Sequence, residues 1–574
     1  MTLRIAGLTL LLLASLNAAQ LSIEFVAKWE ARPVTLSESW HAARNNSSLS
    51  LSRIAYLVSE PLLIDSTGSE HILNDWYGLI DFEAGVTSVD LVGLPPLEFT
   101  AIEFLIGLKP EVNQSDPAKF PAKHPLNPIH NKLHWNWQDG YIFLALEGRW
   151  QTKYKKGGFS YHLGNEPHRI RVRIPAAVDL RTSDAQLILD FNLDHALANI
   201  AYAKTSSTHG RPGDPLALQL KEQAQDAFSV ARIDSAQKQP AIPAVKSIAN
   251  PFIGTPYPLK ISKFFPLPPL PIDYPLSTER VELGRRLFHD SSLSRDATVS
   301  CASCHQSERA FADRGKRSTG IDRQVGKRNS MPLVNLAWKQ QFFWDGRVNS
   351  LREQALFSIE NETEMGASLP LVEKRLSLHP AYPSLFKGAF GSREISAERI
   401  GVAIEQFLLS QTSADSRFDR AVKGEAELSE QEKRGLKLFF TEHDPRRKLY
   451  GADCFHCHGG PLFSDHAFHN NGLRLTTDHG RALITHRDID IGKFSTPSLR
   501  NVGITAPYMH DGRLKTLEEV VEHYSTGIYR SPTLNPNLAK HSGQGIPMTD
   551  IDKAALVAFL KTLTDSRYLH SASK

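Results

Sequence analysis

The sequence predicts a multidomain protein, with an N-terminal all-β sandwich followed by two mostly α-helical domains that repeat one another. Three observations predict this fold class. Apolar residues alternate with a period of two in residues 21–200, helix and loop patterns replace this alternation after residue 276, and the motif C-x-x-C-H occurs at residues 301–305 and again at 454–458. A chain of 574 residues is long enough for several domains.

Residues 1–20 have the composition of a secretory signal peptide. Arg4 precedes an apolar stretch from Leu8 to Leu16, and small residues follow at Ala18 and Ala19. No later stretch is apolar for long enough to span a bilayer. The four cysteines all fall in the two motifs, so none remains for lipidation or a disulfide. The mature protein is therefore expected in a bacterial periplasm, with no membrane span.

Residues 21–200 are expected to form the sandwich. Every second residue from Leu21 to Trp29 is apolar, and the alternation recurs at residues 170–174 and 187–193. Turn signals such as Asp139-Gly140 separate these segments, as is typical of short antiparallel strands.

Residues 201–275 are expected to link the β region to the helical region. One helix is predicted from Leu216 to Ile233. A proline-rich stretch then runs to Pro275 and leaves no room for regular structure, so it should pack along a surface in an extended form.

The helical region is predicted to contain two duplicated domains, residues 276–416 and 417–574. A glycine-to-phenylalanine pattern precedes each C-x-x-C-H motif at similar spacing, at residues 284–288 and 435–439. Each domain also ends in a helical apolar pattern, from Ile400 to Leu408 in one and from Leu556 to Leu563 in the other. One duplicated unit explains this better than a single large domain.

The C-x-x-C-H motif is the attachment signature of c-type haem, in which the cysteines form thioethers and the histidine binds the iron. A zinc site or a dithiol redox pair would not require a histidine directly after the second cysteine in both copies. Two covalent haems c are therefore expected, and the helical domains are of the cytochrome c type. The haem-binding residues are Cys301, Cys304 and His305 for the first haem and Cys454, Cys457 and His458 for the second.

The charge of the chain gives little information about partners. The formal net charge is +4, and the chain has no basic run, so a nucleic-acid partner is not expected.

Residues 250–574 resemble the di-haem cytochrome c peroxidase and MauG family. The matching segments occur in the order found in that family and cover the whole helical region. They are residues 283–288 (LGRRLF), 301–305, 328–329 (RN), 343–347 (FWDGR), 364–366 (EMG), 454–458, 496–501 (TPSLRN), 505–512 (TAPYMHDG) and the helix from Leu517 to Tyr524.

The resemblance implies that the first haem reacts with hydrogen peroxide. Glu364 and Gln354 match the two side chains on its open side, where a carboxylate can move the proton of bound peroxide. On residue type alone, Glu364 would be an exposed acid in the acidic loop 360–364. Trp344 matches the residue that lies between the two haems. These three residues are the expected catalytic residues.

The sixth ligand of the second haem separates two branches of the family. It is a methionine in the peroxidases and a tyrosine in MauG-like enzymes, and the matching residue here is Tyr524. A phenolate stabilises oxidised iron, whereas a thioether raises the reduction potential. Met548 and Met509 remain alternative ligands.

The family also holds a calcium ion between its two haem domains. The matching ligands are the Asn329 side chain and the carbonyls of Thr505 and Pro507, which are oxygen donors of the kind that calcium prefers.

Two residues depart from the family pattern. Ala452 stands where MauG has a surface tryptophan, so the electron route to a substrate must differ. Ser358 replaces a proline near the open side of the first haem, which changes the polarity expected there.

Residues 21–200 resemble MbnP, a secreted copper-binding β-protein. Two short segments carry this resemblance, residues 134–143 (HWNWQDGYIF) and 159–164 (FSYHLG). In such proteins histidines and a tryptophan oxidised to kynurenine form the copper site, and the partner MbnH, a MauG-like di-haem enzyme, performs the oxidation. Imidazole is a good copper ligand. The resemblance implies a copper site that includes His124, Trp135 and His162; either Trp135 or Trp137 could be the modified residue.

Together these features favour a periplasmic di-haem oxidoreductase, MbnH-like and fused to an MbnP-like domain. It would use hydrogen peroxide to oxidise a tryptophan to kynurenine in its own or a separate MbnP-like domain. One alternative is a di-haem cytochrome c peroxidase that takes electrons from a small cytochrome or cupredoxin. The other is a non-enzymatic copper-binding or electron-carrier protein.

Overall fold

The computed structural model describes residues 18–43, 46–136, 140–236 and 253–568. It divides into two compact units, which are described separately: residues 1–117 with 124–248 (unit 1), and residues 118–123 with 249–574 (unit 2). Within the described ranges, no helix has the length and apolar character needed to cross a bilayer. Residues 1–17 of the predicted signal peptide lie outside the described residues. Strand β1 (Ala19–Trp29) contains residues 19 and 20, so the expected boundary at residue 20 falls inside a strand.

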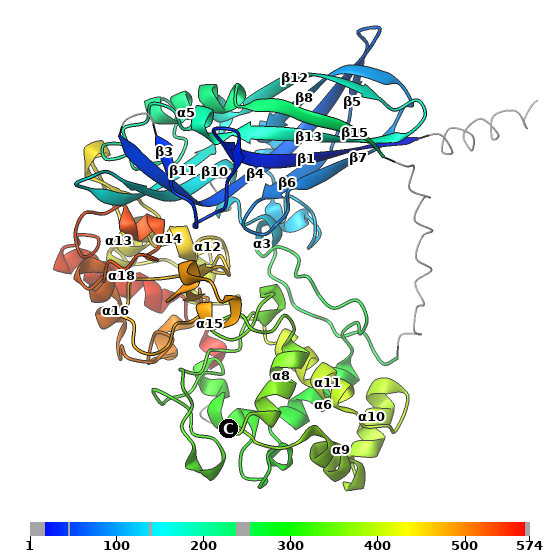
Figure 1. The fold of residues 1–574 in the computed structure, drawn as a ribbon. Coiled ribbons are helices and arrows are strands. Elements are labelled where there is room, and N and C mark those ends of the chain that lie inside the picture. The colour runs from blue at the N-terminus through cyan, green and yellow to red at the C-terminus, as the bar shows by residue number, and fades with distance from the viewer. Residues whose placement is uncertain (1–17, 44–45, 137–139, 237–252, 569–574) are drawn as a thin grey trace, which may run out of the picture. The chain divides into compact units, whose positions relative to one another are not determined.

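The predicted N-terminal β sandwich is confirmed. The larger sheet has the order β12 (Ile170–Asp179), β8 (Glu98–Ile106), β4 (Ser47–Asp65), β10 (Gly140–Gln151), β11 (Lys156–Gly164), β14 (Ser207–Thr208). Short strands β3 (His41–Ala43), β5 (Glu70–Ile72) and β6 (Tyr77–Asp81) pair with β4, and β9 (His134–Asn136) pairs with β10. Figure 1 shows β12, β8, β4 and β10 in this sheet.

The smaller sheet is built around β1. Its order is β15 (Phe228–Ala236), β13 (Asp184–Asn192), β1, β2 (Arg32–Pro33), with β7 (Ser88–Leu94) also paired to β1. Strands β1 and β13 are parallel, and the other pairs in this sheet are antiparallel.

One hydrophobic core fills the space between the two sheets. Because burial alternates strictly along β1, Leu21, Ile23, Phe25, Ala27 and Trp29 are buried on one face, and Val26 lies on the half-buried opposite face. On the buried face Phe25 meets Tyr56 of β4 and Phe104 of β8 edge-on, with ring centroids 5.7 and 5.8 Å apart. These contacts between strands of different sheets make the unit a sandwich.

The predicted link at residues 201–275 is wrong in its first part. Helix α5 (Pro215–Gln225) ends eight residues before Ile233, and β15 follows it as an edge strand of the smaller sheet. Phe228 stacks on Phe191 of β13 with ring centroids 4.5 Å apart. Residues 201–236 therefore belong to the sandwich, because burial of Phe228 against β13 overrides the helical tendency of the preceding segment.

The proline-rich stretch packs on unit 2 in an extended form. Phe265 is buried beneath the Arg500 guanidinium, 4.6 Å from the ring centroid, and the Trp338 indole donates a hydrogen bond of 2.6 Å to the carbonyl of Pro266.

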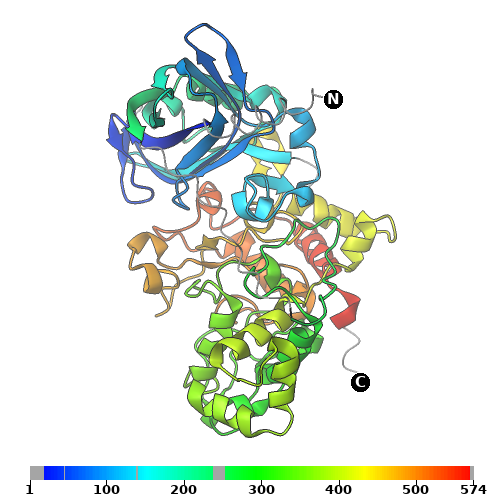
Figure 2. The same ribbon diagram turned by 90° about the vertical axis from the view of Figure 1, so that its right-hand side faces the viewer.

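Unit 2 is helical, as predicted, and its first half is arranged around one crossing pair of helices. The helices of this half are α6 (Thr278–Phe288), α7 (Cys301–Cys304), α8 (Leu351–Glu360), α9 (Leu369–Leu378), α10 (Tyr382–Phe390) and α11 (Ala397–Leu409). Figures 1 and 2 show α6, α8 and α11 grouped together.

The second half repeats this arrangement. Its helices are α12 (Arg417–Val422), α13 (Glu430–Phe439), α14 (Phe455–His458), α15 (Ala482–Thr485), α16 (Leu517–Thr526), α17 (Pro536–Ala539) and α18 (Asp550–Thr562). The pair α13 and α18 corresponds to α6 and α11 of the first half.

Two glycines show how closely the halves match. A Cβ atom on Gly284 of α6 would lie 1.8 Å from the Ala403 carbonyl oxygen of α11, and one on Gly435 of α13 would lie 2.0 Å from the Ala555 carbonyl oxygen of α18. In each half, therefore, only glycine allows the two helices to cross at this distance. The same crossing is thus built twice from the same sequence feature.

Candidate active site

Both haem-attachment motifs present a histidine that is held for iron binding. His305 Nδ1 lies 2.7 Å from the carbonyl oxygen of Phe311, and His458 Nδ1 lies 3.0 Å from that of Phe463. Phe311 and Phe463 both adopt left-handed backbone conformations, with φ of 61° and 52°. A ring nitrogen that donates to a carbonyl leaves Nε2 as the ligand atom, as is usual for metal-bound histidine. Burial lowers the pKa of both imidazoles, which favours the neutral form that binds metal.

The four cysteines are all free of disulfides, as haem attachment requires. A cavity of about 850 Å³ adjoins the first motif and is lined by Cys301, Cys304 and His305. Its size and its mixed apolar and polar walls suit a large planar cofactor. The residues present therefore fit a covalent haem at this position.

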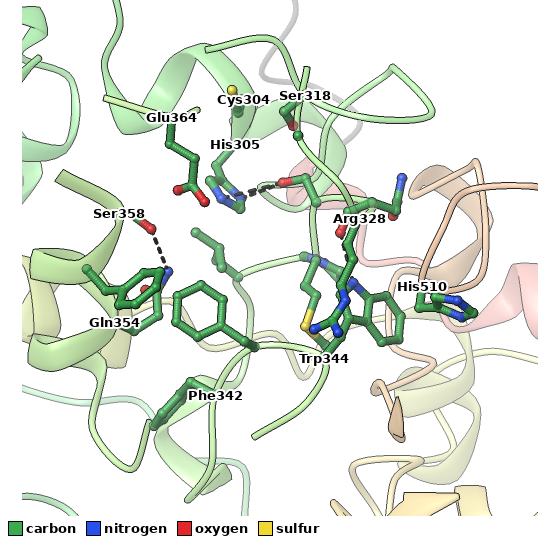
Figure 3. Close-up of a pocket in the computed structure, with 18 of the residues that line it drawn as sticks. Cys304, His305, Ser318, Arg328, Phe342, Trp344, Gln354, Ser358, Glu364 and His510 are labelled. Atoms are coloured by element: carbon green, nitrogen blue, oxygen red, sulfur yellow. Dashed lines mark hydrogen bonds between the residues drawn. The ribbon is translucent and has the colours of Figure 1, made fainter. Parts of the chain in front are cut away.

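Glu364 and Gln354 line this cavity, as does Ser358 between them (Figure 3). Asn361 donates a hydrogen bond of 3.0 Å to the Glu364 carboxylate, and the Gln354 amide nitrogen lies 3.3 Å from the Ser358 hydroxyl oxygen. Burial raises the pKa of Glu364, although hydrogen bonds from Ser358 and Asn361 and the charge of Arg347 act in the opposite direction. Glu364 is thus a half-buried carboxyl group in the cavity wall, and it is not an exposed acid of the loop.

Trp344 forms another part of the cavity wall. Its side chain is 8% exposed, and its indole nitrogen donates a hydrogen bond of 2.8 Å to the carbonyl of Asn329. The Asn329 backbone nitrogen in turn donates to the carbonyl of His510, also at 2.8 Å. The ring of His510 stacks on Phe494 with centroids 3.6 Å apart. Figure 3 shows Trp344 and His510 on the same side of the cavity.

Tyr524 lies on α16 and is enclosed by the second half. Burial raises the pKa of its hydroxyl group. The Asn471 amide nitrogen is 3.4 Å from the Tyr524 hydroxyl oxygen and 3.4 Å from the Met509 sulfur. Met548 packs against a different apolar cluster, the one that contains Phe559. The structure therefore brings Tyr524 and Met509 to one amide and places Met548 elsewhere.

The three expected calcium ligands lie in two loops of unit 2. The side-chain nitrogen of Asn329 donates to the carbonyl of Lys316 at 3.2 Å. Thr505 and Pro507 flank Ala506, whose carbonyl accepts a hydrogen bond from Arg309. The two loops meet where Asn329 bonds to His510.

Ala452, the first departure from the family pattern, is 4% exposed and belongs to the apolar core of the second half. It therefore offers no surface side chain for electron exit.

In unit 1, two of the three expected copper-site residues come together with a histidine that the sequence analysis did not select. The rings of His162 and His209 are 5.3 Å apart between centroids, and Trp135 is 6.3 Å from His209. The Nε2 atom of His162 lies 2.9 Å from a Glu147 carboxylate oxygen. His124 lies instead against Tyr77, with ring centroids 5.9 Å apart.

His209 was missed because it lies in the polar, turn-rich segment assigned to the link. Strand β14, which pairs with β11, places it beside His162. The Trp135 indole nitrogen is buried and has no hydrogen-bond partner among the described residues. The ring packs against Gly164, where a Cβ atom would lie 2.5 Å from it. Trp137 lies outside the described residues.

Comparisons with known proteins match the two units separately. The family model for di-haem cytochrome c peroxidase matches residues 278–427, and the MbnP model matches residues 18–210. The methylamine utilization protein MauG of Methylorubrum extorquens is 38% identical over 299 residues, which are 51% of this chain and 81% of that protein.

Two further matches fall in the same half of the chain. Cytochrome c551 peroxidase of Nitrosomonas europaea is 33% identical over 305 residues, which are 52% of this chain and 84% of that protein. The crystal structure of a MauG-like protein associated with microbial copper homeostasis shares 37% identity. It covers 55% of this chain and 97% of its own, with a TM-score of 0.49.

Proposed function

Because the chain belongs to the di-haem cytochrome c peroxidase family that includes MauG, we propose that it uses hydrogen peroxide to oxidise Trp135 or Trp137 to kynurenine, in its own or a separate MbnP-like domain. Members of this family are di-haem oxidoreductases. The observation that carries the choice of substrate is the buried Trp135 beside His162 and His209, in a domain covalently joined to the haem-bearing unit.

When bound, the two haems would supply the iron redox chemistry that activates hydrogen peroxide. The residues of the chain have distinct roles around them. His305 would ligate the iron of the first haem, and His458 and Tyr524 would ligate the iron of the second. Glu364 accepts a proton from peroxide and returns it to the leaving oxygen. Gln354 orients the bound molecule, and Trp344 shortens the electron path between the two halves.

The conversion of tryptophan to kynurenine is a four-electron oxidation. It breaks the indole C2–C3 bond, consumes two molecules of hydrogen peroxide, and releases formate and water. The side chain thereby loses one carbon and gains one oxygen. The covalent connection between the units favours this reaction, since a tether raises the effective concentration of a substrate domain.

Copper is the proposed ligand of the finished site in unit 1. His162 and His209 supply imidazole donors, and the oxidised Trp135 side chain supplies a carbonyl or amine. His124 is not part of this proposal, because its ring lies against Tyr77. A calcium ion held by Asn329, Thr505 and Pro507, and a periplasmic location, complete the proposal.

Peptide mass mapping of the haem-loaded protein tests this function. After peroxide treatment, the wild type should show both haem attachments and the loss of one carbon and gain of one oxygen at Trp135 or Trp137. Glu364→Gln should abolish the change, whereas Glu362→Gln, at an exposed position in the same loop, should not. If both tryptophans remain intact in the fully loaded wild type, with or without copper, the N-terminal domain is not the substrate.

A second candidate function is supported by Met509. Its sulfur shares the Asn471 amide with Tyr524, so a thioether lies beside the same amide as the tyrosine hydroxyl group. With methionine ligation, the protein would be a peroxidase that draws electrons from a small cytochrome or cupredoxin. Replacing Met509 by leucine would then destroy the low-spin spectrum of the second haem, and replacing Tyr524 by phenylalanine would leave it unchanged.

A further inference from the structure

One segment has the same structure in both halves of unit 2. Residues 342–360 and 508–526 correspond without a gap. An antiparallel bridge closes a short loop in each segment, between Phe342 and Val348 in the first half and between Tyr508 and Leu514 in the second. A glycine with a positive φ lies inside each loop, and in the first half this is Gly346, with a φ of 71°. The equivalent Gly512 has a φ of 65°.

The helix that follows begins in the same way in both halves. The Ser350 hydroxyl accepts a hydrogen bond from the Glu353 backbone nitrogen at the start of α8, and the Thr516 hydroxyl accepts one from the Glu519 nitrogen at the start of α16. Each of these caps fixes the first turn of its helix. The two helices therefore start in the same register.

The buried face of the two helices follows the same register. Leu351 and Leu517, the first helical residues, are 2% and 3% exposed, and Ala355 and Val521, four residues later, are 5% and 6% exposed. The eighth residue of each helix is then Ser358 in the first half and Tyr524 in the second. Ser358 thus occupies the place that the proposed iron ligand occupies in the second half.

Ser358 has the surroundings of a distal residue. It lines the cavity of the first haem together with Gln354 and Glu364. Its hydroxyl oxygen is 3.3 Å from the Gln354 amide nitrogen, one turn earlier on α8, and it also hydrogen-bonds to the Glu364 carboxyl group. The short side chain therefore contacts both proposed catalytic groups, and it is shorter than a tyrosine side chain. Figure 3 shows Ser358 with its hydrogen bond to Gln354.

We propose that position 358 determines the coordination state of the first haem. Serine keeps the distal position open, because its side chain is too short to reach the place of a sixth ligand, and its hydroxyl holds Gln354 and Glu364 in position. Ser358 is thus a positioning residue, and the difference between Ser358 and Tyr524 is what separates the reactive haem from the six-coordinate one. The inference rests on the proposed open coordination at His305.

The test uses the full-length, haem-loaded protein and low-temperature EPR of the ferric state. The wild type should show one high-spin and one low-spin signal. Ser358→Tyr should convert the high-spin signal to a second low-spin signal and abolish the reaction with peroxide. Glu360→Tyr, at an exposed position on the same helix, should leave both signals unchanged.

Ser358→Ala separates the two roles of the side chain. It should keep the high-spin signal, because the position stays open, and it should slow the peroxide reaction about tenfold, the effect of one hydrogen bond. If Ser358→Tyr does not retain haem, Ser358→His replaces it, with the same low-spin signal expected. Haem content is measured by mass spectrometry in every variant.

The possible failures are distinguishable. A wild type without a high-spin signal would overturn the proposed open coordination, and with it the proposed function. The second failure would be a high-spin signal in the wild type that persists in the haem-loaded Ser358→Tyr and Ser358→His variants. This result would overturn only the inference about position 358.

Discussion

The two halves of unit 2 have the same backbone design and different side chains around the haem. In both halves two helices cross at a glycine, and the carbonyl of a phenylalanine holds the histidine of the C-x-x-C-H motif. In both, an Asp-Gly-Arg turn precedes the helix that we call the distal helix, α8 in the first half and α16 in the second. On the distal helix the first half has Ser358 and the second half has Tyr524. The two halves therefore share the scaffold that presents the attachment motif, and in the proposed function their distal side chains account for the different chemistry of the two haems.

The largest effect is expected from removing the distal ligand of the second half. Tyr524→Phe should leave both haems attached and abolish the low-spin signal of the second iron, because the anionic donor is lost. EPR of the ferric protein and mass spectrometry of the haem peptides check this. An unaltered low-spin signal in Tyr524→Phe would make Met509 the ligand, and the two halves would then differ in another way.

In the first half, the corresponding change removes the proton-transfer group. Glu364→Gln should slow the reaction with peroxide by about a hundredfold to ten-thousandfold, the usual range for general acid–base help. Stopped-flow absorbance of the haem band gives the rate. The matched control Glu362→Gln should react as fast as the wild type; equal rates in all three proteins would show that Glu364 has no part in proton transfer.

The halves also differ in a buried ion pair. Asn335 of the first half and Asn501 of the second are equivalent, and both have a left-handed backbone conformation. The residue before this asparagine is Val334 in the first half and Arg500 in the second. Arg500 forms a buried pair with Asp419 at 2.8 Å. Arg500→Leu would leave a buried carboxylate unpaired and should lower the free energy of unfolding by about 3–5 kcal/mol.

Urea unfolding of the haem-loaded protein measures this loss of stability. The control is Arg434→Leu, which removes a partly exposed pair with Asp552 in the same half and should cost no more than about 1 kcal/mol. Equal losses in the two variants would mean that burial of the Asp419 pair is unimportant.

The two crossing glycines predict equal effects in the two halves. Gly284→Ala and Gly435→Ala should each destabilise by about 1–3 kcal/mol, because the new methyl group has no room against a backbone carbonyl. Gly388→Ala on α10, where nothing lies within 4 Å, should instead stabilise slightly. Thermal unfolding compares the three. A large effect in only one half would show that the crossings are not equivalent.

The smallest effect concerns the contribution of the Asp419–Arg500 pair to acid stability, because the first half has Val334 in the place of Arg500. Burial acts to raise the pKa of Asp419, but the Arg500 charge and hydrogen bonds from Arg500 and Ser416 outweigh it and hold the pKa below its usual value. A depressed folded-state pKa contributes stability above the unfolded value, near pH 4, and this stability is lost as the pH falls further. Asp419→Asn should therefore flatten the decrease in stability below about pH 4, measured by urea unfolding at a series of pH values.

Much of this molecule could be predicted from its sequence. The strict alternation from Leu21 to Trp29 predicts a strand with one buried face, and β1 has that pattern. The two C-x-x-C-H motifs predict histidines prepared for iron, and both have their Nδ1 atoms directed to carbonyls. Such features are local, so the sequence contains the whole signal.

The errors involve contacts between distant segments. The segment ending at Ile233 has helical spacing, yet it turns into an edge strand because Phe228 stacks on Phe191. His209 gives no signal in a turn-rich segment, and only the pairing of β14 with β11 brings it to His162. The expectation for His124 rests on its residue type, whereas the tertiary structure places its ring against Tyr77.

Arg328 lies between the halves of unit 2 and is bound to both. It pairs with Asp345 of the first half at 2.6 Å and with Asp478 of the second at 2.7 Å. Beside it, Asn329 joins the indole of Trp344 to the backbone of His510. Two such cross-braces keep the spacing of the haem-bearing halves constant. Charge exchange between them should therefore proceed at the same speed in a viscous medium as in dilute buffer, because no swinging motion is needed to bring the redox centres within range.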